Sequence, residues 1–490
     1  MNKKQIIKVV TFLLILAVLV HGIGRFLVEK FSTPCYETVA QHEFYEQEKN
    51  SIDVLFVGSS QVSEGIAIPY LYNEYGISAY SIGSSSQPLQ VSYMWMKEAR
   101  KTQDLEVVVL DVSRLYQTSP TQWYHKGLVN MKFSLDKMKD LWEYCSTQEE
   151  ADPFLSFLFP MYKYHERWAG LTKYDFTALK QDNNCYRGFF VRKTHVETDI
   201  DVMAYDNDKP NPNVEMIDYQ FKYLEKIVQY CKENNQKLLL IKTPKYDWSI
   251  SKHEQMQEYA DANGLTFLDC SSRAMIEELG LDLSIDMGDE EHFNILGAQK
   301  FTSWIGKYLK ENYELTDYRG TEHGEFLQKE YERCERYAAM GRALLLNDVK
   351  AYFECMNNDR YEVLIQLSAH DAGVHSAEMT QLMQSLGLKT DMEKIDGKRY
   401  LAWIQNGEVK YEGSEKQFFE FADKFANGKG FRMYSNFDET VTAKMRVNFK
   451  DVVFQKHGMN ILIYDSEADR IMTTYTIYSD KSGVLKLYGY

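Results

Sequence analysis

The chain of 490 residues has little of what marks a fibrous, disordered or metal-stabilised protein. It contains only 9 prolines and 27 glycines while 44% of its residues are hydrophobic, which excludes collagen-like and largely disordered classes. Its seven cysteines include no Cys-x-x-Cys pair and no His/Cys cluster at zinc spacing, so we expect no structural metal and no cofactor. The net charge is −15 and the sequence has no block rich in Lys and Arg, which argues against a nucleic-acid partner.

One long apolar run is present, close to the N-terminus. Three lysines precede Val9–Val20, and a run of about 20 residues just spans a bilayer. More positive charge precedes the run than directly follows it, so we expect the N-terminus in the cytoplasm and the rest of the chain outside it. A cleaved signal peptide is the alternative, although no Ala-x-Ala site follows the run. We predict a single-pass signal anchor over residues 1–30 and a tether over 31–50.

Alternating strands and helices predict an α/β domain over residues 51–315. Its strand candidates are near-continuous apolar runs, typical of a doubly wound parallel sheet covered on both faces. An aromatic-rich insertion over 112–214 interrupts the alternation. The expected strands are Asp53–Val57, Ala79–Ile82, Glu106–Asp111, Lys237–Lys242 and Thr266–Asp269.

The C-terminal part has a different pattern. Residues 316–360 read as a helical connector, and residues 361–490 as a β-rich α+β domain. Helices are expected within it at Ala377–Leu386 and Glu415–Phe425. The expected strands are Tyr361–Ser368, Arg399–Gln405, Gly430–Ser435, Thr442–Phe449, Met459–Asp465 and Ile471–Tyr478.

A serine follows the first strand of the α/β domain. Ligands of doubly wound sheets bind outside the carboxyl ends of the strands, where Ser60 follows Gly58-Ser59. A serine at this turn can present its hydroxyl to a substrate, and its backbone N–H can face a developing oxyanion. The same Gly-Ser-Ser sequence is also common in ordinary turns.

A histidine follows the last strand of the same domain. Serine attacks poorly unless a base takes its proton, and His292 should reach the same edge of the sheet. Asp289, three residues earlier, can bind the imidazole and hold its tautomer. Asp-x-x-His alone also occurs in solvated loops. The combination of Ser60, Asp289 and His292 at strand ends of one domain predicts nucleophilic acyl chemistry.

These motifs resemble those of the SGNH/GDSL hydrolase family. Gly58-Ser59-Ser60-Gln61 stands where that family has Gly-Asp-Ser-Leu, and Asp289-x-x-His292 with Phe293-Asn294 matches its last block. The resemblance implies that Ser60 is the nucleophile, that Asp289 and His292 complete a triad, and that the Ser60 and Gly83 amides form the oxyanion hole.

The chain departs from the family pattern at two places. Ser59 replaces the usual aspartate, and the family's Gly-x-Asn-Asp block is missing after the third strand, where the chain reads Asp111-Val-Ser-Arg114. The third oxyanion donor is therefore unassigned, with Gln87 and Arg114 as candidates. Losing one such donor costs about 100-fold in rate.

The anchored layout resembles the acyl-transfer branch of this family. That branch includes the D-alanyl transfer protein of teichoic acid synthesis and proteins of exopolysaccharide O-acetylation, which work beside membrane-bound O-acyltransferases. The resemblance implies a cell-surface polysaccharide or other acyl ester as substrate. Within the insertion, Tyr164–Trp168 could form a lid or a sugar platform that includes Arg167 and Trp168; the alternative is that Trp168 is core and Arg167 a surface ion pair. His165 could be a second catalytic base or an ordinary polar residue whose hydrogen bonds are satisfied.

Residues 361–490 resemble the interleukin-like domain that also serves as a carbohydrate-binding stem. The matching segments are Gly397–Ile404, Glu408–Tyr411 and Gly458–Asp465. The resemblance implies a non-catalytic module that binds glycan or a partner. The chain as a whole is therefore expected to be an extracytoplasmic serine esterase or O-acyltransferase, most simply for acetyl groups. The alternative is a non-catalytic docking partner of a membrane acyltransferase.

Overall fold

The computed structural model divides the chain into two compact units, Met1–Cys334 and Glu335–Tyr490. The structure describes residues 2–28, 36–171, 175, 185–211, 213–367, 374–395, 397–435, 443–454 and 458–489. The start of the expected tether (with Cys35), part of the expected insertion and the first residue of the expected strand Thr442–Phe449 lie outside these ranges.

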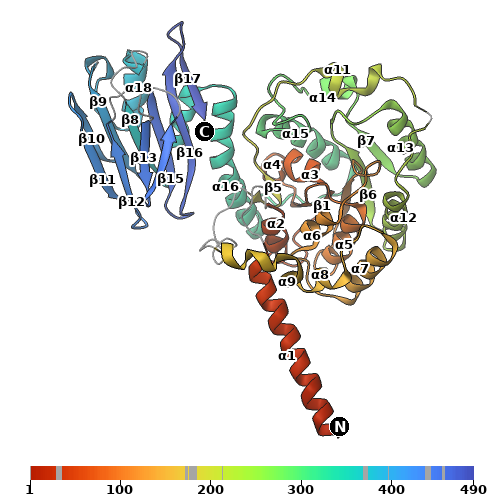
Figure 1. Cartoon of the computed structure of the whole chain (residues 1–490). Coiled ribbons are helices and arrows are strands. Elements are labelled where there is room, and N and C mark those ends of the chain that lie inside the picture. Colours follow the sequence, from red (N-terminus) through yellow and green to blue (C-terminus); the bar gives the residue numbers. More distant parts are fainter. Residues whose placement is uncertain are drawn as a thin grey trace. The chain divides into compact units, whose positions relative to one another are not determined.

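The N-terminal helix α1 (Lys3–Leu27) begins with a reciprocal cap. The Asn2 side chain accepts from the Gln5 N–H and the Gln5 side chain accepts from the Asn2 N–H, both at 2.9 Å. Among the described residues, one stretch, Lys3–Gly24 of this helix, is long and apolar enough to cross a membrane. Figure 1 shows α1 projecting from the rest of its unit.

Part of the segment expected to be a tether is a packed helix, α2 (Tyr36–Phe44). Phe44 is buried in the main core. The Ala40 carbonyl oxygen accepts a 2.7 Å hydrogen bond from the Tyr80 hydroxyl. Buried Glu37 accepts from the backbone N–H and the hydroxyl of Ser85, at 3.1 and 2.7 Å. Helix α2 therefore belongs to the globular part of this unit.

Five parallel strands form the central sheet of the first unit, in the order β2-β1-β3-β6-β7. The strands are β1 (Val54–Gly58), β2 (Ala79–Gly83), β3 (Val107–Asp111), β6 (Lys237–Lys242) and β7 (Thr266–Asp269). Strand β1 pairs with β2 on one side and β3 on the other. The connection from β1 to β2 and the connection from β2 to β3 therefore run in opposite directions across the sheet. Ligands bind at such a switch point in open α/β sheets.

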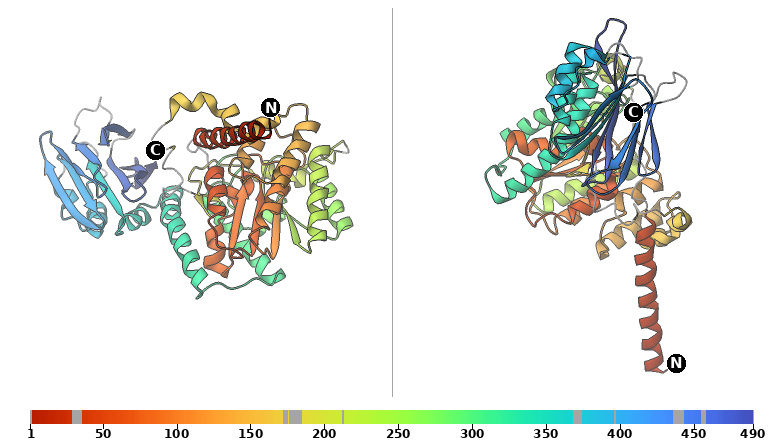
Figure 2. Two further views of the ribbon diagram at one scale, coloured as in Figure 1. Left: turned by 90° about the horizontal axis from the view of Figure 1, so that it is seen from below. Right: turned by 90° about the vertical axis from the view of Figure 1, so that its left-hand side faces the viewer.

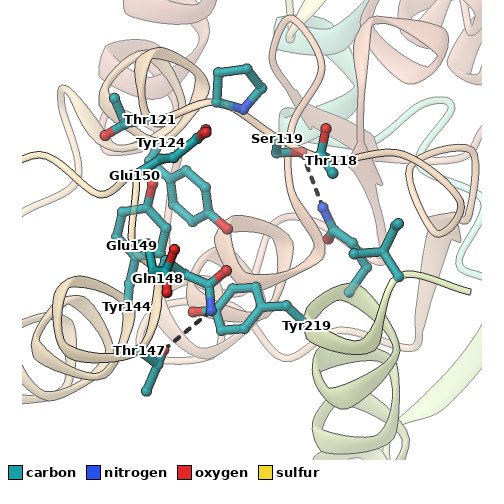
Figure 3. A pocket seen from close by; sticks show the side chains of 13 residues that line it. Thr118, Ser119, Thr121, Tyr124, Tyr144, Thr147, Gln148, Glu149, Glu150 and Tyr219 are labelled. Carbon is teal, nitrogen blue, oxygen red and sulfur yellow. Dashed lines mark hydrogen bonds between the residues drawn. The ribbon is translucent and has the colours of Figure 1, made fainter.

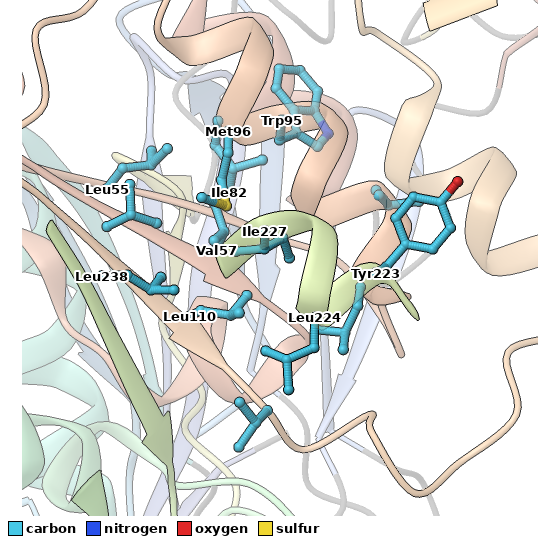
Figure 4. Close-up of a cluster of buried hydrophobic side chains, with 14 of the residues drawn as sticks. Leu55, Val57, Ile82, Trp95, Met96, Leu110, Tyr223, Leu224, Ile227 and Leu238 are labelled. Atoms are coloured by element: carbon cyan, nitrogen blue, oxygen red, sulfur yellow. The ribbon is translucent and has the colours of Figure 1, made fainter. Parts of the chain in front are cut away.

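Helices cover this sheet. Leu55 and Val57 of β1 point into a cluster with Trp95 and Ile227 from the helices on that side (Figure 4). Phe56, between them, is fully buried on the opposite face. Each such side chain contributes about 1.5–3 kcal/mol on burial. The helices are α3 (Ser60–Gly65), α4 (Ile68–Tyr75), α5 (Leu89–Ala99), α12 (Asp218–Glu233), α13 (Ile250–Asn263), α14 (Arg273–Glu278) and α15 (Ile295–Asn312).

The expected insertion is largely helical. Its elements are α6 (Thr121–Leu128), α7 (Leu135–Thr147), α8 (Phe154–Leu158), α9 (Pro160–Tyr164), the 3-10 helix η1 (His165–Gly170), β4 (Cys185–Tyr186), β5 (Phe189–Phe190), α11 (Ile200–Met203) and η3 (Tyr205–Asn207). Figure 2 shows its helices from two further directions. Helix α16 (Glu322–Leu345) then leads across the boundary between the two units.

The second unit contains two antiparallel sheets, of six strands (β10-β9-β8-β15-β16-β17) and four strands (β11-β12-β13-β14). Leu401 and Trp403 of the first sheet and Phe431 and Met433 of the second share one core. The strands are β8 (Tyr361–Leu367), β9 (Arg399–Gln405), β10 (Glu408–Glu415), β11 (Glu420–Lys424), β12 (Gly430–Tyr434), β13 (Ala443–Val447), β14 (Lys450–Phe454), β15 (Met459–Asp465), β16 (Arg470–Ser479) and β17 (Leu485–Gly489). The helices are α17 (Val349–Met356), α18 (Ala377–Ser385) and the 3-10 turn η5 (Met392–Lys394).

The predicted α/β unit with a parallel sheet and the β-rich C-terminal unit are confirmed. The predicted helix at Glu415–Phe425 is wrong, because this segment contains the end of β10 and strand β11. Phe419 and Phe421 stand on either side of Glu420, and Phe421 stacks on Tyr411 with ring centroids 3.8 Å apart. The period of two is that of a strand.

Candidate active site

A tight turn between β1 and α3 presents Ser60. Ser59 is the N-cap of α3, and its hydroxyl accepts from the Gln61 N–H at 3.3 Å. The same hydroxyl donates to Asp111 Oδ2 at 2.6 Å, which ties the turn to the end of the neighbouring strand β3. A Cβ at Gly58 would lie 2.4 Å from the Asp111 Cβ, so only glycine allows this approach. Ser60 thereby becomes the first residue of the helix.

A second loop, between α14 and α15, carries Asp289 and His292. Asn294 ends this loop as the N-cap of α15, accepting from the Leu296 N–H at 2.9 Å. The Gln61 side chain donates to the Glu291 carbonyl oxygen at 2.9 Å, so the residue after Ser60 holds the histidine loop directly. The two loops are thus fixed to each other by hydrogen bonds.

The structure brings Ser60, His292 and Asp289 into one hydrogen-bonded chain. Ser60 Oγ lies 2.7 Å from His292 Nε2. His292 Nδ1 lies 2.9 and 3.1 Å from the two carboxylate oxygens of Asp289. Asp289 Oδ1 also accepts from the backbone N–H groups of Glu291 and His292, at 2.8 and 2.9 Å. With Nδ1 protonated toward Asp289, Nε2 is free to accept the proton of Ser60.

The surroundings keep Asp289 ionised. Partial burial alone would raise the pKa of its carboxyl, but the hydrogen bond and charge of His292, the Glu291 N–H and the Arg192 guanidinium together lower the pKa below its usual range. An ionised Asp289 can stabilise an imidazolium at His292.

Arg192 and Glu64 join the site without any signal in the sequence that points to them. Arg192 Nη1 lies 2.9 Å from Asp289 Oδ2, and Arg192 Nε donates to buried Glu64 Oε2 at 2.6 Å. Glu64 stands one turn after Ser60 on α3 and Arg192 comes from the insertion, so only the packed fold brings them together. Arg192 thus orients the carboxylate that orients His292.

Gly83 and Gln87 lie on the loop after β2. Gly83 pairs with Gly58 across the sheet, and a Cβ there would lie 2.8 Å from the Ser59 carbonyl oxygen, so glycine lets α3 start beside β2. The Gln87 amide nitrogen donates to the Ile82 carbonyl oxygen and to the Ser92 hydroxyl, at 3.3 and 3.0 Å. Gln87 is therefore engaged in holding its own loop.

Arg114 follows β3 and is largely buried. Burial lowers the pKa of its guanidinium, while Asp111, Asp247 and Glu291 raise it, which places it among the acidic groups at this edge of the sheet. Arg114 Nη2 donates to the Thr118 carbonyl oxygen at 2.6 Å. Its Nε is buried and has no hydrogen-bond partner within the part of the chain that the structure describes.

His165, Arg167 and Trp168 lie in η1, beside the end of α1. They take no part in the hydrogen bonds that join Ser60, His292 and Asp289. Arg167 donates to the Leu27 carbonyl oxygen at 2.6 Å and pairs with Asp175 at 2.7 Å. Trp168 is 66% exposed, so the alternative that it belongs to the core is wrong. Exposed His165 contacts only its own turn among the hydrogen bonds of the described residues, at 3.3 Å from the Tyr162 carbonyl oxygen.

A separate cavity of about 330 Å³ lies between α6, α7 and the start of α12 (Figure 3). Tyr124, Tyr144 and Tyr219 line it together with Thr118 and Gln148. None of the predicted site residues is among those that line it.

Across the described residues, no group of three or more His, Cys, Asp or Glu side chains could hold a metal ion, and six cysteines are free thiols. Neither a scan of protein-family models nor a search of curated proteins finds a match to this chain.

Proposed function

We propose that this protein is a serine acyl-ester hydrolase or O-acyltransferase. The observation that carries the proposal is the hydrogen-bonded chain from Ser60 Oγ through His292 to Asp289, at 2.7 and 2.9 Å. Ser60 is within hydrogen-bond distance of the base His292, and His292 is within hydrogen-bond distance of the orienting carboxylate Asp289, as serine catalysis requires.

The reaction proceeds in two halves. Ser60 Oγ attacks the carbonyl carbon of an ester while His292 Nε2 takes the hydroxyl proton. The tetrahedral intermediate collapses, the C–O bond to the leaving alcohol breaks, and His292 gives its proton to that alcohol. Water or a sugar hydroxyl then loses a proton to His292 and attacks the acyl-Ser60 ester, which releases an acid or an acylated sugar and restores the serine.

Two backbone amides are suited to the oxyanion. The Ser60 N–H stands at the first position of α3, where no carbonyl of the same helix accepts from it. Gly83 lies beside the same turn. Arg114 is the better candidate for a third donor, because its buried Nε is unpartnered among the described residues whereas the Gln87 amide is engaged.

The fold and the motif positions support membership of the SGNH/GDSL family. Nucleophile and histidine loops lie at the switch point of a five-stranded parallel sheet, as that family requires. The lysines before the apolar run of α1 support an anchored, extracytoplasmic protein. Envelope or exopolysaccharide esters as substrates are what the resemblance to the acyl-transfer branch implies. The β-rich second unit then serves as a non-catalytic glycan- or partner-binding module.

Hydrolysis of p-nitrophenyl acetate by the full chain in detergent tests the proposal. Ser60→Ala should abolish turnover, whereas Ser63→Ala, one turn later in the same helix, should retain most of it. Labelling by a fluorophosphonate probe should be lost in the same variant. Turnover that survives in Ser60→Ala contradicts the assignment of the nucleophile.

The missing Gly-x-Asn-Asp block favours a second candidate, a non-catalytic docking partner of a membrane-bound O-acyltransferase, because the asparagine donor of the family's oxyanion hole is absent after β3. Wild-type protein that is folded but neither hydrolyses the ester nor reacts with the fluorophosphonate supports this candidate. Labelling without hydrolysis instead indicates a transferase that needs its acceptor.

A further inference from the structure

The helices of the insertion expose an unusual set of large apolar side chains. Each member of the set is more than half exposed, and large apolar side chains that gather on the surface mark an interaction site. The set, named here the aromatic face, consists of Phe133, Leu135, Trp142, Leu155, Tyr162 and Trp168.

The helices that carry these side chains contact one another in chain order. Trp142 of α7 meets Phe154 of α8 edge to face, with ring centroids 5.5 Å apart. The Phe159 N–H between α8 and α9 donates to the Leu155 carbonyl oxygen at 2.9 Å, and η1 with Trp168 follows α9 directly. The members of the aromatic face therefore lie on consecutive, contacting elements, from the segment just before α7 to η1.

The C-terminal end of α1 packs against the same helices. His21 Nδ1 lies 2.9 Å from the Leu158 carbonyl oxygen, and Arg167 donates to the Leu27 carbonyl oxygen. A Cβ at Gly24 would lie 2.8 Å from the Met161 backbone nitrogen, so α1 and α9 approach closely. Figures 1 and 2 both show α7, α8 and α9 at the end of the unit from which α1 extends.

A membrane around α1 would meet this end of the unit first. Tryptophan and tyrosine concentrate at membrane–water interfaces, where an apolar ring and a polar tip are both accommodated. Leucine and phenylalanine beside them add apolar area that water solvates poorly. The chemistry of the surface thus matches the region between lipid headgroups and acyl chains.

We propose that the aromatic face inserts into the interface of the lipid bilayer that α1 crosses. The α/β unit is then held against the membrane at two points, one spanning and one interfacial. This inference depends on α1 being a membrane helix and not on the chemistry of Ser60.

Tryptophan quenching by lipids tests the contact, because α1 contains no tryptophan. The full chain is reconstituted in phosphatidylcholine vesicles whose lipids carry bromine near the headgroup end of the acyl chains. Two of the seven tryptophans, Trp142 and Trp168, belong to the aromatic face. Quenching should therefore remove about a quarter of the emission in wild-type protein.

The variant Trp142→Phe with Trp168→Phe should lose most of the quenching, whereas Trp304→Phe on α15 should leave it unchanged. Alkaline extraction of the vesicles checks separately that α1 is inserted. Inserted wild-type protein without quenching overturns the proposal and points to a protein partner on this face. Equal quenching in the double variant and wild type overturns it as well.

Discussion

Asp289→Asn separates the orienting role of this residue from its role in shaping the loop. The asparagine oxygen can still accept from the Glu291 and His292 N–H groups, which Asp289 Oδ1 does at 2.8 and 2.9 Å. The amide NH₂ would replace Oδ2, which faces Arg192 Nη1 at 2.9 Å and His292 Nδ1 at 3.1 Å. The NH₂ group would face the Arg192 donor and would compete for His292 Nδ1 with Oδ1, which lies 2.9 Å from that nitrogen. In the molecules where Nδ1 accepts from the NH₂ group, His292 carries its proton on Nε2, which then cannot accept the Ser60 proton.

The size of the effect follows from two contributions. An imidazolium and a carboxylate about 4 Å apart attract by about 4 kcal/mol at an effective dielectric constant of about 20. Asp289 is 39% exposed and His292 14%, so solvent screening reduces this to about 2 kcal/mol, or about 30-fold in rate. Loss of the productive tautomer adds to it, since the equivalent change in a serine protease costs about 10⁴-fold in total. We expect kcat/KM to fall by about 10³-fold.

The assay is ester hydrolysis by the full chain, with Asp282→Asn as the matched control. Asp282 accepts from the Ser284 N–H two residues on, at 3.0 Å, as Asp289 does from Glu291, but it has no histidine partner among the hydrogen bonds of the described residues. The control should keep wild-type activity. A kcat/KM within tenfold of wild type in Asp289→Asn would refute the assigned role.

Three further predictions concern stability and packing. Arg192→Gln leaves the buried Glu64 carboxylate without its guanidinium partner and should lower the free energy of unfolding by about 3–5 kcal/mol in denaturant titrations. Adding Glu64→Gln should recover part of this loss. An unchanged free energy of unfolding in Arg192→Gln contradicts the pairing. Gly83→Ala should cost about 1–3 kcal/mol and reduce turnover, because its Cβ would press on the carbonyl oxygen at the α3 N-cap; unchanged turnover contradicts this. The lowered pKa of Asp289 stabilises the folded state above the ordinary pKa of about 3.9, and this contribution is lost as pH falls through the folded pKa. The difference in thermal midpoint between wild type and Asp289→Asn should therefore shrink below about pH 4, and a difference that grows on acidification contradicts it.

Much of the site can be predicted from local sequence. Ser60 follows a short run of apolar residues that predicts a buried strand. Asp289 and His292 stand three residues apart in one loop, so only the approach of this loop to Ser60 depends on the fold. The strand order, together with the close approach to Asp111 that Gly58 allows, fixes the Ser60 turn at the edge of the sheet where the histidine loop lies.

The partners of these residues depend on packing that no local pattern records. Glu64 and Arg192 are 128 residues apart in the chain. Helix α2 is short and weakly patterned, and its place is set by the Glu37 contact with Ser85 and by Phe44 in the core. In the second unit, the predicted helix at Glu415–Phe425 is replaced by the end of β10 and by β11. Phe421 of β11 contacts Phe431 of the paired strand β12 and stacks on Tyr411 of the other sheet, and these contacts between distant residues favour the strand.

Helix α2 limits how far the α/β unit can lie from a membrane that α1 crosses. Nine residue steps separate Leu27, the last residue of α1, from Tyr36, the first residue of the packed helix. Even fully extended, they reach no more than about 30 Å. With α1 in a bilayer, the α/β unit samples only a thin shell above the lipid. Under the proposed function, its encounter rate then depends on the local concentration of substrate in that shell rather than on the bulk concentration. Acceptors further out would have to be brought inward to react.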